Sequence, residues 1–119
     1  CARNATEIDA CRQEWKKKGY KVHAIEADVS CDAGMQLIID EVNKKFGGSV
    51  DSLVNNVGSN IRKRAIEFSE SEYDHIMRTN LKSAFTLTAR LHPCLSKSRT
   101  GASVVNIGSV AGKSSYRMT

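Results

Sequence analysis

The segment Val50-Asp51-Ser52-Leu53-Val54-Asn55-Asn56-Val57-Gly58 joins a short apolar run to a polar turn. The part from Val50 to Val54 is typical of a short strand, because an apolar run of this length is bounded by turn residues. The asparagines and the glycine that follow favour a turn. The segment therefore predicts a strand that ends in a loop.

Helices and strands alternate on both sides of this segment. The spacing of apolar residues predicts helices at 5–20, from 30 to 47–48 and from 69 to the region of Pro93, and strands at 21–28, 50–54 and 103–107. Short connections between these elements favour right-handed crossovers and a parallel sheet with helices on both faces. The predicted fold class is α/β, with a doubly wound parallel sheet in one domain over 1–119.

The starts of the three predicted helices carry capping residues. Asn4 and Glu7 have capping-box spacing, as do Ser69 and Glu72, and Ser30 is predicted to cap the second helix. One face of the long third helix is expected to be buried, and it comprises Tyr73, Ile76, Met77, Leu81, Ala84, Thr88 and Leu91. Asn80 falls in the register of this face, and a buried amide needs hydrogen-bond partners.

Charge and cysteine content narrow the classes of function. The net charge of +5 comes from dispersed basic residues apart from Lys16–Lys18 and Arg62–Arg64, and neither run has an aromatic stacking pattern, so no nucleic-acid partner is expected. The four cysteines form neither a zinc-site spacing nor a dense disulfide framework, so no metal is expected, and reduced thiols in a cytoplasmic protein are the default expectation. No membrane partner is expected, because no stretch reaches the roughly twenty apolar residues of a bilayer span.

Small or polar residues follow each predicted strand. In doubly wound folds, ligands bind beyond the carboxyl ends of the strands. The residues at these positions are Arg3-Asn4, Asp28-Val29, Asn55 to Gly58, and Gly108-Ser109. They predict one crevice that holds a ligand.

These residues also carry a family resemblance. Cys1-Ala2-Arg3-Asn4, Asp28-Val29, Asn55-Asn56-Val57-Gly58, Asn80 and Ile107-Gly108-Ser109 together resemble the short-chain dehydrogenases/reductases. Three further segments are similar to the plant tropinone-reductase-like branch, and they are Trp15 to Gly19, Asn60 to Lys63, and His92-Pro93. The resemblance implies a Rossmann-type NADP(H)-binding domain that transfers a hydride between NADPH and a small carbonyl or alcohol substrate, in a homo-oligomer of two or four subunits.

The resemblance assigns three of these residues to the adenosine end of the cofactor. Arg3 would lie beside the adenosine ribose, where a guanidinium suits the 2′-phosphate of NADP. Asp28 and Val29 would contact the adenine ring through the carboxylate and a backbone amide. Without the family pattern, Arg3 reads as a surface arginine at a strand end and Asp28 as a residue that leads into a helix.

The resemblance places the other candidates nearer the reaction. Asn55, Val57 and Gly58 would belong to a cofactor-binding turn in which Val57 replaces the usual alanine. Asn80 would be the catalytic asparagine that holds a water, although an asparagine bonded to a neighbouring loop is the structural alternative. Ser109 would hydrogen-bond the substrate carbonyl oxygen. The glycine pattern around Ser109 does not match the nucleophile elbow of a hydrolase.

Two parts of the family pattern are missing from this sequence. The glycine-rich loop and the first strand would precede Cys1, and the Tyr-x-x-x-Lys pair would follow Thr119. Tyr116 is not assigned the catalytic role, because no lysine follows four positions later. The fragment alone is therefore predicted to be inactive, and to be unstable or prone to aggregation because its half-sheets keep unpaired edges. Cooperative unfolding of the soluble 119-residue chain would contradict this expectation.

Two other functions remain open at this stage. The chain is alternatively a noncatalytic truncated product that binds a full-length relative through the helix from Ser69 to Leu91. Phe85 and Leu87 lie off the main apolar stripe of that helix and support this alternative. A protein of related fold that resembles NAD-dependent sugar epimerases is disfavoured by Arg3 and by the turn from Asn55 to Gly58.

Overall fold

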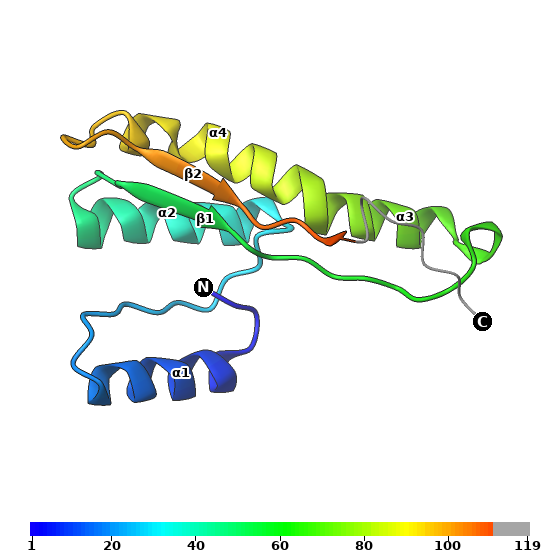
Figure 1. Cartoon of the computed structure of the whole chain (residues 1–119), viewed down its shortest axis with the longest axis horizontal. Coiled ribbons are helices and arrows are strands. Elements are labelled where there is room, and N and C mark those ends of the chain that lie inside the picture. The colour runs from blue at the N-terminus through cyan, green and yellow to red at the C-terminus, as the bar shows by residue number, and fades with distance from the viewer. Residues whose placement is uncertain (111–119) are drawn as a thin grey trace.

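The computed structural model describes residues 1–110, and it alternates helices with short extended segments (Figure 1). The helices are α1 (Ala5–Lys17), α2 (Asp32–Phe46), η1 (Ala65–Glu67, a 3₁₀ turn), α3 (Glu70–Met77), η2 (Arg78–Lys82, a π-helix) and α4 (Ser83–Leu95). The strands are β1 (Ser52–Asn55) and β2 (Ser103–Asn106). The predicted order of elements is confirmed for five of the six, and the exception is the strand at 21–28.

The helices α1, α2 and α3 each start with a side-chain cap, and η2 and α4 each continue from the helix before them. The Asn4 side chain accepts hydrogen bonds from the backbone amides of Thr6 and Glu7 at the start of α1. The prediction that Ser30 caps α2 is wrong. The amide of Ser30 donates to Asp28 Oδ1 at 2.8 Å, and the cap passes to Cys31, whose Sγ accepts from the amide of Gly34 at 3.4 Å. A turn closed by an aspartate side chain thus moves the start of the helix along by one residue.

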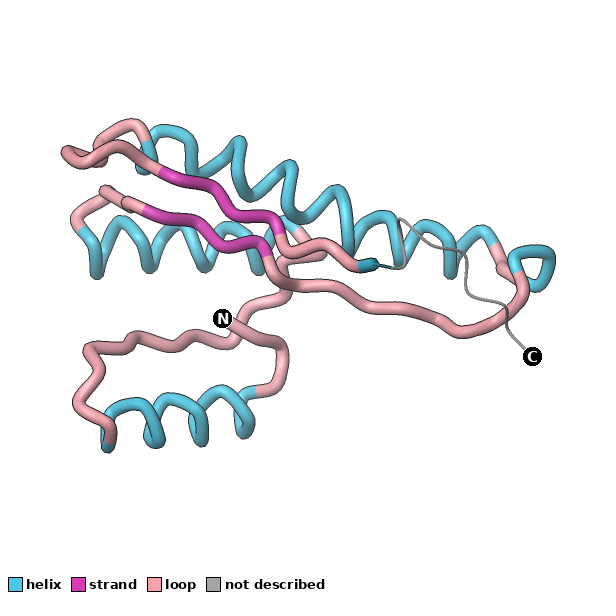
Figure 2. Tube along the Cα trace, viewed as in Figure 1, coloured by secondary structure: helices cyan, strands magenta, loops and turns pink. Residues whose placement is uncertain are grey.

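The sheet within residues 1–110 consists of two strands, and one isolated bridge lies apart from it. Strands β1 and β2 pair in parallel, with Leu53 opposite Val104 and Asn55 opposite Asn106. The predicted strand at 21–28 forms only one isolated parallel bridge, between Glu26 and Ala2. The physical reason is the lack of a partner, because only Cys1 and Ala2 reach this segment and a ladder needs a neighbour at every residue. The rest of the segment 21–28 runs as a loop beside α1 (Figure 2).

The long third helix is interrupted, which corrects the predicted buried face. In η2 the amide of Ser83 bonds the carbonyl of Arg78, a five-residue step, so the 3.6-residue register shifts between α3 and α4. Leu87, expected off the stripe, is buried, whereas Tyr73 and Leu81 are exposed. Pro93 lies inside α4, which ends at Leu95.

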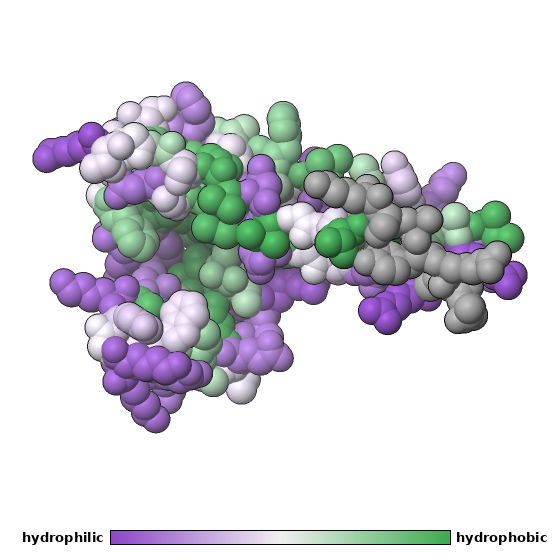
Figure 3. Space-filling view, in the orientation of Figure 1, coloured by the Kyte–Doolittle hydropathy of each residue, from purple (hydrophilic) through white to green (hydrophobic). Residues whose placement is uncertain are grey.

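The core lies between α2, α4 and one face of the β1–β2 pair. Its buried members are Val29, Met35, Leu87, Leu91, Cys94 and Leu95, with Ile38, Ile39, Val42, Val50 and Leu53 packed against them. Figure 1 shows the two strands crossing in front of α2 and α4, so the helices cover one face. Apolar surface gathers on the open face in Figure 3. Val54 and Val105, opposite each other in the register, are both exposed.

The helices of residues 1–110 are shorter or less apolar than a bilayer span requires. None of them is long and apolar enough to cross a membrane. This part of the chain therefore contains no candidate membrane helix.

Candidate functional site

The carboxyl ends of the extended segments meet around one cavity of about 360 Å³. The residues that line it come from the start of the chain, from the loop before α2 and from the loop after β1, and they are Cys1, Ala2, Arg3, Asn4, Glu7, Ala27, Asp28, Val29, Asn56 and Val57. Four candidates, Arg3, Asp28, Val29 and Val57, therefore lie together. We call this cavity the strand-end cavity.

Arg3 and Asp28 give the strand-end cavity opposite charges. Hydrogen bonding from Ser30 lowers the pKa of the Asp28 carboxyl below its usual value, and the nearby charge of Arg3 adds to the effect, although burial acts in the other direction. Asp28 is therefore an ionised acceptor at neutral pH. Its Oδ1 atom also accepts the amide of Ser30, so Asp28 both closes the turn before α2 and faces the cavity.

Gly34 keeps the turn at Asp28 close to α2. A Cβ atom at Gly34 would lie 2.0 Å from the backbone carbonyl oxygen of Asp28, which is far inside contact distance. Only glycine permits this approach without movement of the backbone. The position of the Asp28 carboxylate thus depends on a glycine one turn into the next helix, which the sequence analysis did not single out.

Asn55 holds the end of β1 to its neighbours. Its Nδ2 atom donates to Thr88 Oγ1 on α4 at 3.0 Å and to Asn106 Oδ1 on β2 at 2.9 Å. The Asn55 side chain therefore fixes the strand ends against each other and does not line the strand-end cavity. Neither partner was predicted from the sequence, although Asn106 stands out as an amide that ends an apolar strand.

Asn80 lies in η2 and binds the loop after β1. Its Oδ1 atom accepts from the amide of Ser59 at 2.8 Å, and its Nδ2 atom donates to the carbonyl of Ser59 at 2.8 Å. A Cβ atom at Gly58 would lie 3.6 Å from Asn80 Oδ1, so the glycine passes close to the amide. The predicted burial of Asn80 is wrong, since the residue is exposed, but the expected loop partner is present.

A second hollow of about 590 Å³ lies between α4 and the end of β2. Asn80, Asn106 and Gly108 contribute to its lining, together with Leu81, Ala84, Phe85, Thr88, Ala89, Val104 and Ile107. Ser109 follows directly on Gly108 and is exposed. The structure thus brings Asn80 and the segment before Ser109 to one hollow, which is separate from the strand-end cavity. Tyr116 lies outside the described residues.

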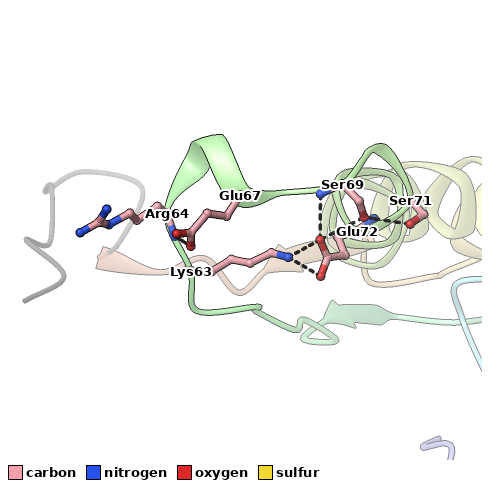
Figure 4. A network of polar contacts seen from close by, with 6 residues as sticks. All are labelled: Lys63, Arg64, Glu67, Ser69, Ser71 and Glu72. Carbon is pink, nitrogen blue, oxygen red and sulfur yellow. Dashed lines mark hydrogen bonds and ion pairs between the residues drawn. The ribbon is translucent and has the colours of Figure 1, made fainter.

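A polar network fastens the loop at 59–68 to α3 (Figure 4). Lys63 Nζ lies 2.7 Å from Glu72 Oε1 and 2.5 Å from Glu72 Oε2, and Ser69 and Glu72 form the predicted capping box. Hydrogen bonding from Lys63, followed by the amide of Ser69, lowers the pKa of Glu72 to about 2. The loop that carries Ser59 is therefore held at both ends, by Asn80 and by Glu72.

Metal chemistry has no support in the described part of the chain. Among residues 1–110, no group of three or more His, Cys, Asp or Glu side chains could hold a metal ion. The arrangement instead offers a cationic and an anionic side chain at the strand ends, and two asparagine amides beside a second hollow.

Comparison with known proteins identifies the family. The model of the short chain dehydrogenase family matches residues 1–119, so the chain belongs to the short-chain dehydrogenases/reductases. Members of this family are oxidoreductases that use nicotinamide cofactors and act on small-molecule substrates, commonly as oligomers. The fold is accordingly an incomplete doubly wound Rossmann-type α/β fold.

Within the family, the chain is similar to plant tropinone reductase homologues. It is 44% identical over 112 residues to the Arabidopsis thaliana tropinone reductase homolog At5g06060, covering 94% of this chain and 42% of that protein. It is 36% identical to a tropinone reductase homolog of Datura stramonium over the same share of this chain and 41% of that protein. The chain thus spans about two fifths of the length of these relatives.

A solved structure has the same fold. The crystal structure of a putative short-chain dehydrogenase/reductase from Burkholderia xenovorans aligns with a TM-score of 0.84 and 26% sequence identity. The alignment covers 94% of this chain and 44% of that one. The described elements are therefore arranged like part of that longer chain.

Proposed function

We propose that residues 1–119 form the central part of a single NADP-binding domain, and that the whole protein transfers a hydride between NADPH and a carbonyl or alcohol substrate. The observation that carries this proposal is the strand-end cavity, where Arg3, Asp28, Val29 and Val57 come together. A cationic group and an anionic acceptor at the carboxyl ends of the strands match the chemistry of an adenosine phosphate.

NADPH is the cofactor that the charges favour. Arg3 offers a guanidinium for the 2′-phosphate, whereas a carboxylate at this position would favour the 2′-hydroxyl of NADH. Asp28 would accept from the exocyclic amine of adenine, and the backbone amide of Val29 would reach the ring. Asn55 and Gly58 would support the turn that passes beside the cofactor.

Asn80 and Ser109 would contribute to the reaction itself. Ser109 would hydrogen-bond the substrate carbonyl oxygen, and Asn80 would help to hold a water near the catalytic lysine. Both polar atoms of the Asn80 side chain are already hydrogen-bonded to Ser59. The water would therefore bind the backbone at η2, where the π-helix disturbs the regular hydrogen bonds. The cofactor supplies the hydride, and the tyrosine and lysine would come from sequence beyond Thr119.

The names of the relatives suggest a tropinone-reductase-like protein that acts on a small ketone or alcohol. We place the protein in the cytoplasm as a homo-oligomer, although one relative is named as chloroplastic. Cell fractionation with an antibody to residues 1–119 tests the location, and recovery with chloroplasts would contradict it.

The first experiment is to measure the mass of the native polypeptide. Immunoprecipitation with an antibody to residues 1–119, followed by peptide mapping, is expected to recover a protein roughly twice this length, since family domains run well beyond the part covered here. Its peptides should include a glycine-rich loop upstream and Tyr-x-x-x-Lys downstream. A product near 13.1 kDa would contradict the reductase proposal for this molecule. Residues 1–119 alone are expected to be inactive.

The second experiment compares NADPH and NADH in that protein. Arg3→Gln is expected to weaken NADPH binding by roughly 10- to 100-fold, the value of a lost charge-assisted hydrogen bond, and to leave NADH binding nearly unchanged. Arg99→Gln is the matched control, because Arg99 precedes β2 at the opposite end of the strand. Equal losses for both cofactors would contradict a contact with the 2′-phosphate.

A noncatalytic role is the second candidate, and one observation supports it. Tyr73, Met77, Leu81 and Phe85 recur at four-residue spacing along α3, η2 and α4, and all four are exposed. A truncated product would use this apolar stripe to bind a full-length relative. Leu81→Ser with Phe85→Ser should abolish co-purification with the relative, whereas Ile66→Ser, at a site 89% exposed, should not. Unchanged co-purification of the double variant would contradict this role.

A further inference from the structure

The carboxyl ends of α1, α2 and α4 lie together at one end of the molecule, on the left in Figure 1. The amide of Val50, in the loop after α2, donates to the carbonyl of Cys94 in α4 at 3.1 Å. Trp15 of α1 and Phe46 of α2 line one hollow. These contacts hold the three helix ends side by side. We call this surface the helix-end face, and it comprises residues 14–21, 43–51 and 95–102.

The helix-end face carries more positive charge than the whole chain. Its carboxylates are Glu14 and Asp51. Its cations, all exposed, are Lys16, Lys17, Lys18, Lys21, Lys44, Lys45, Lys97 and Arg99. The formal charge of this face is therefore +6, whereas the net charge of the chain is +5, so the remainder is close to neutral. Basic residues that are dispersed in the sequence are thus gathered at one end by the fold, and hydrophilic side chains project from this end in Figure 3.

Most of these cations have no anionic partner within residues 1–110. The exception is Lys18, whose Nζ atom lies 2.5 Å from Glu14 Oε1. Asp51 accepts a serine hydroxyl at 2.6 Å and forms no ion pair in this part of the chain. Glu41, further along α2 from this end, is bonded to His23. The charge of the face is therefore not neutralised from within the described structure.

The helix dipole explains only part of this charge. Lys16–Lys17 and Lys44–Lys45 lie in the last turns of α1 and α2, where the negative end of the dipole stabilises a cation. Lys21, Lys97 and Arg99 lie outside the helices and have no such stabilisation. Like charges gathered on one face repel one another, and an anionic partner would relieve this repulsion. Two copies of the face would also repel each other, which disfavours self-association through it.

We propose that the helix-end face binds an anionic lipid surface through attraction to the headgroups. Seven of its eight cations are lysines. A lysine places a compact charge on a flexible stem and suits a spread of negative charge, whereas nucleic-acid recognition relies on the fixed fork of arginine. Tyr20 is 61% exposed in the turn between Lys18 and Lys21, and its amphipathic ring suits the headgroup level of a bilayer. The expectation of no membrane partner rested on the lack of a spanning segment, and contact with a membrane surface needs none.

The helix-end face and the strand-end cavity lie at opposite ends of the strands. Strands β1 and β2 begin at Ser52 and Ser103, directly after loops of the helix-end face. The strand-end cavity lies at the carboxyl ends of the extended segments and includes Asn56 and Val57 from the loop after β1. A lipid surface bound at one end therefore leaves the cavity at the other end open. The inference accordingly goes beyond the proposed function and does not depend on the cofactor.

Co-sedimentation with lipid vesicles tests the proposal on the purified whole protein. Vesicles of phosphatidylcholine that contain about 30% phosphatidylserine are expected to bind the protein, and vesicles of phosphatidylcholine alone are not. Binding should weaken as sodium chloride is raised from about 0.05 to about 0.5 M, because salt screens exposed charges.

A pair of charge-matched variants locates the binding surface. Lys44→Gln with Lys45→Gln is expected to weaken binding to the anionic vesicles by roughly 10- to 30-fold, since each lysine near such a surface contributes about fivefold. Arg62→Gln with Arg64→Gln is the matched control, because it removes the same charge from exposed positions in the loop at 59–68, at the other end of the molecule. This control should bind nearly as well as the unchanged protein.

Three outcomes would overturn the proposal. The first is an equal loss of binding in the two variants, and the second is binding that does not require phosphatidylserine. The third is tighter binding to a short DNA duplex than to the vesicles at the same salt concentration, which would assign the face to nucleic acid. NADPH binding should be the same in both variants, so a failure of the proposed function would be seen separately from a failure of this proposal.

Discussion

The side-chain amide of Asn80 bonds both backbone groups of Ser59, with its Oδ1 atom 2.8 Å from the amide nitrogen and its Nδ2 atom 2.8 Å from the carbonyl oxygen. The two residues are 21 positions apart in the chain. This pair fastens the loop after β1 to the π-helix η2. The contact thus joins a residue that lines the second hollow to the loop that contributes Asn56 and Val57 to the strand-end cavity.

Asn80→Asp tests the importance of this pair. The carboxylate keeps the acceptor for the Ser59 amide but places an oxygen against the Ser59 carbonyl, so we expect a loss of about 1 kcal/mol in the free energy of unfolding. Urea denaturation of the purified protein measures it, and hydrogen exchange of the Ser59 amide locates it. Asn60→Asp is the control, at an exposed amide in the same loop. Equal effects of the two variants would contradict the role of Asn80.

Glu72 should make stability depend on pH in acid. Its pKa is lowered from 4.5 to about 2, so its stabilising contribution is complete above about pH 4.5 and is lost as the pH falls through about 2. Glu72→Gln should therefore lower the urea midpoint at pH 7, and the difference from the unchanged protein should shrink as the pH approaches 2. Glu70→Gln is the control, because it removes the same charge from the first turn of α3. A pH-independent difference for Glu72→Gln would contradict the assignment.

Thr88→Val should weaken the attachment of β1 to α4. The substitution keeps the shape of the side chain but removes the hydroxyl that accepts from Asn55 Nδ2. Because Asn55 retains Asn106 as a partner, we expect a loss of only about 1 kcal/mol. Thermal unfolding of the purified protein measures it, with Thr86→Val as the control in the same helix. A loss for Thr86→Val as large as that for Thr88→Val would assign the effect to helix packing.

Gly34→Ala should be among the most damaging small substitutions in the chain. The new Cβ atom would meet the carbonyl oxygen of Asp28 at 2.0 Å, so the turn before α2 has to move. We expect a loss of about 1–3 kcal/mol, as for overpacking in a core, measured by urea denaturation. Ala33→Ser changes the neighbouring exposed position and should have little effect. Near-normal stability of Gly34→Ala would show that the turn adapts.

The elements that the sequence predicted well are those whose signals are local. The helix caps at Asn4 and Ser69 were found because a side chain bonds amides two or three residues away. The apolar run before Asn55 identified β1 for a similar reason. The strand at 21–28 was not formed beyond one bridge, because a strand requires a partner and the described residues supply only Ala2.

The buried face of the third helix could not be predicted from periodicity. The π-helix at Arg78–Lys82 adds a residue to one turn, so the 3.6-residue spacing of a continuous helix does not predict which side chains share a face on either side of it. Leu87 enters the core, and Asn80 turns to the loop at Ser59. The spacing of apolar residues in the sequence does not predict this shift, and Asn80 within the π-helix bonds Ser59 in a loop 21 residues away.

By itself the sequence determined the order of five of the six predicted helices and strands, the caps at Asn4 and Ser69, and the motifs that resemble the short-chain dehydrogenases/reductases. Those features depend on neighbouring residues and on short spacings. Only the tertiary structure decided that Gly108 lies at a second hollow apart from the strand-end cavity, that Asn55 binds Thr88 and Asn106, and that Asn80 binds Ser59. These contacts join residues far apart in the chain, and their geometry exists only once the strands pair and the helices pack against them.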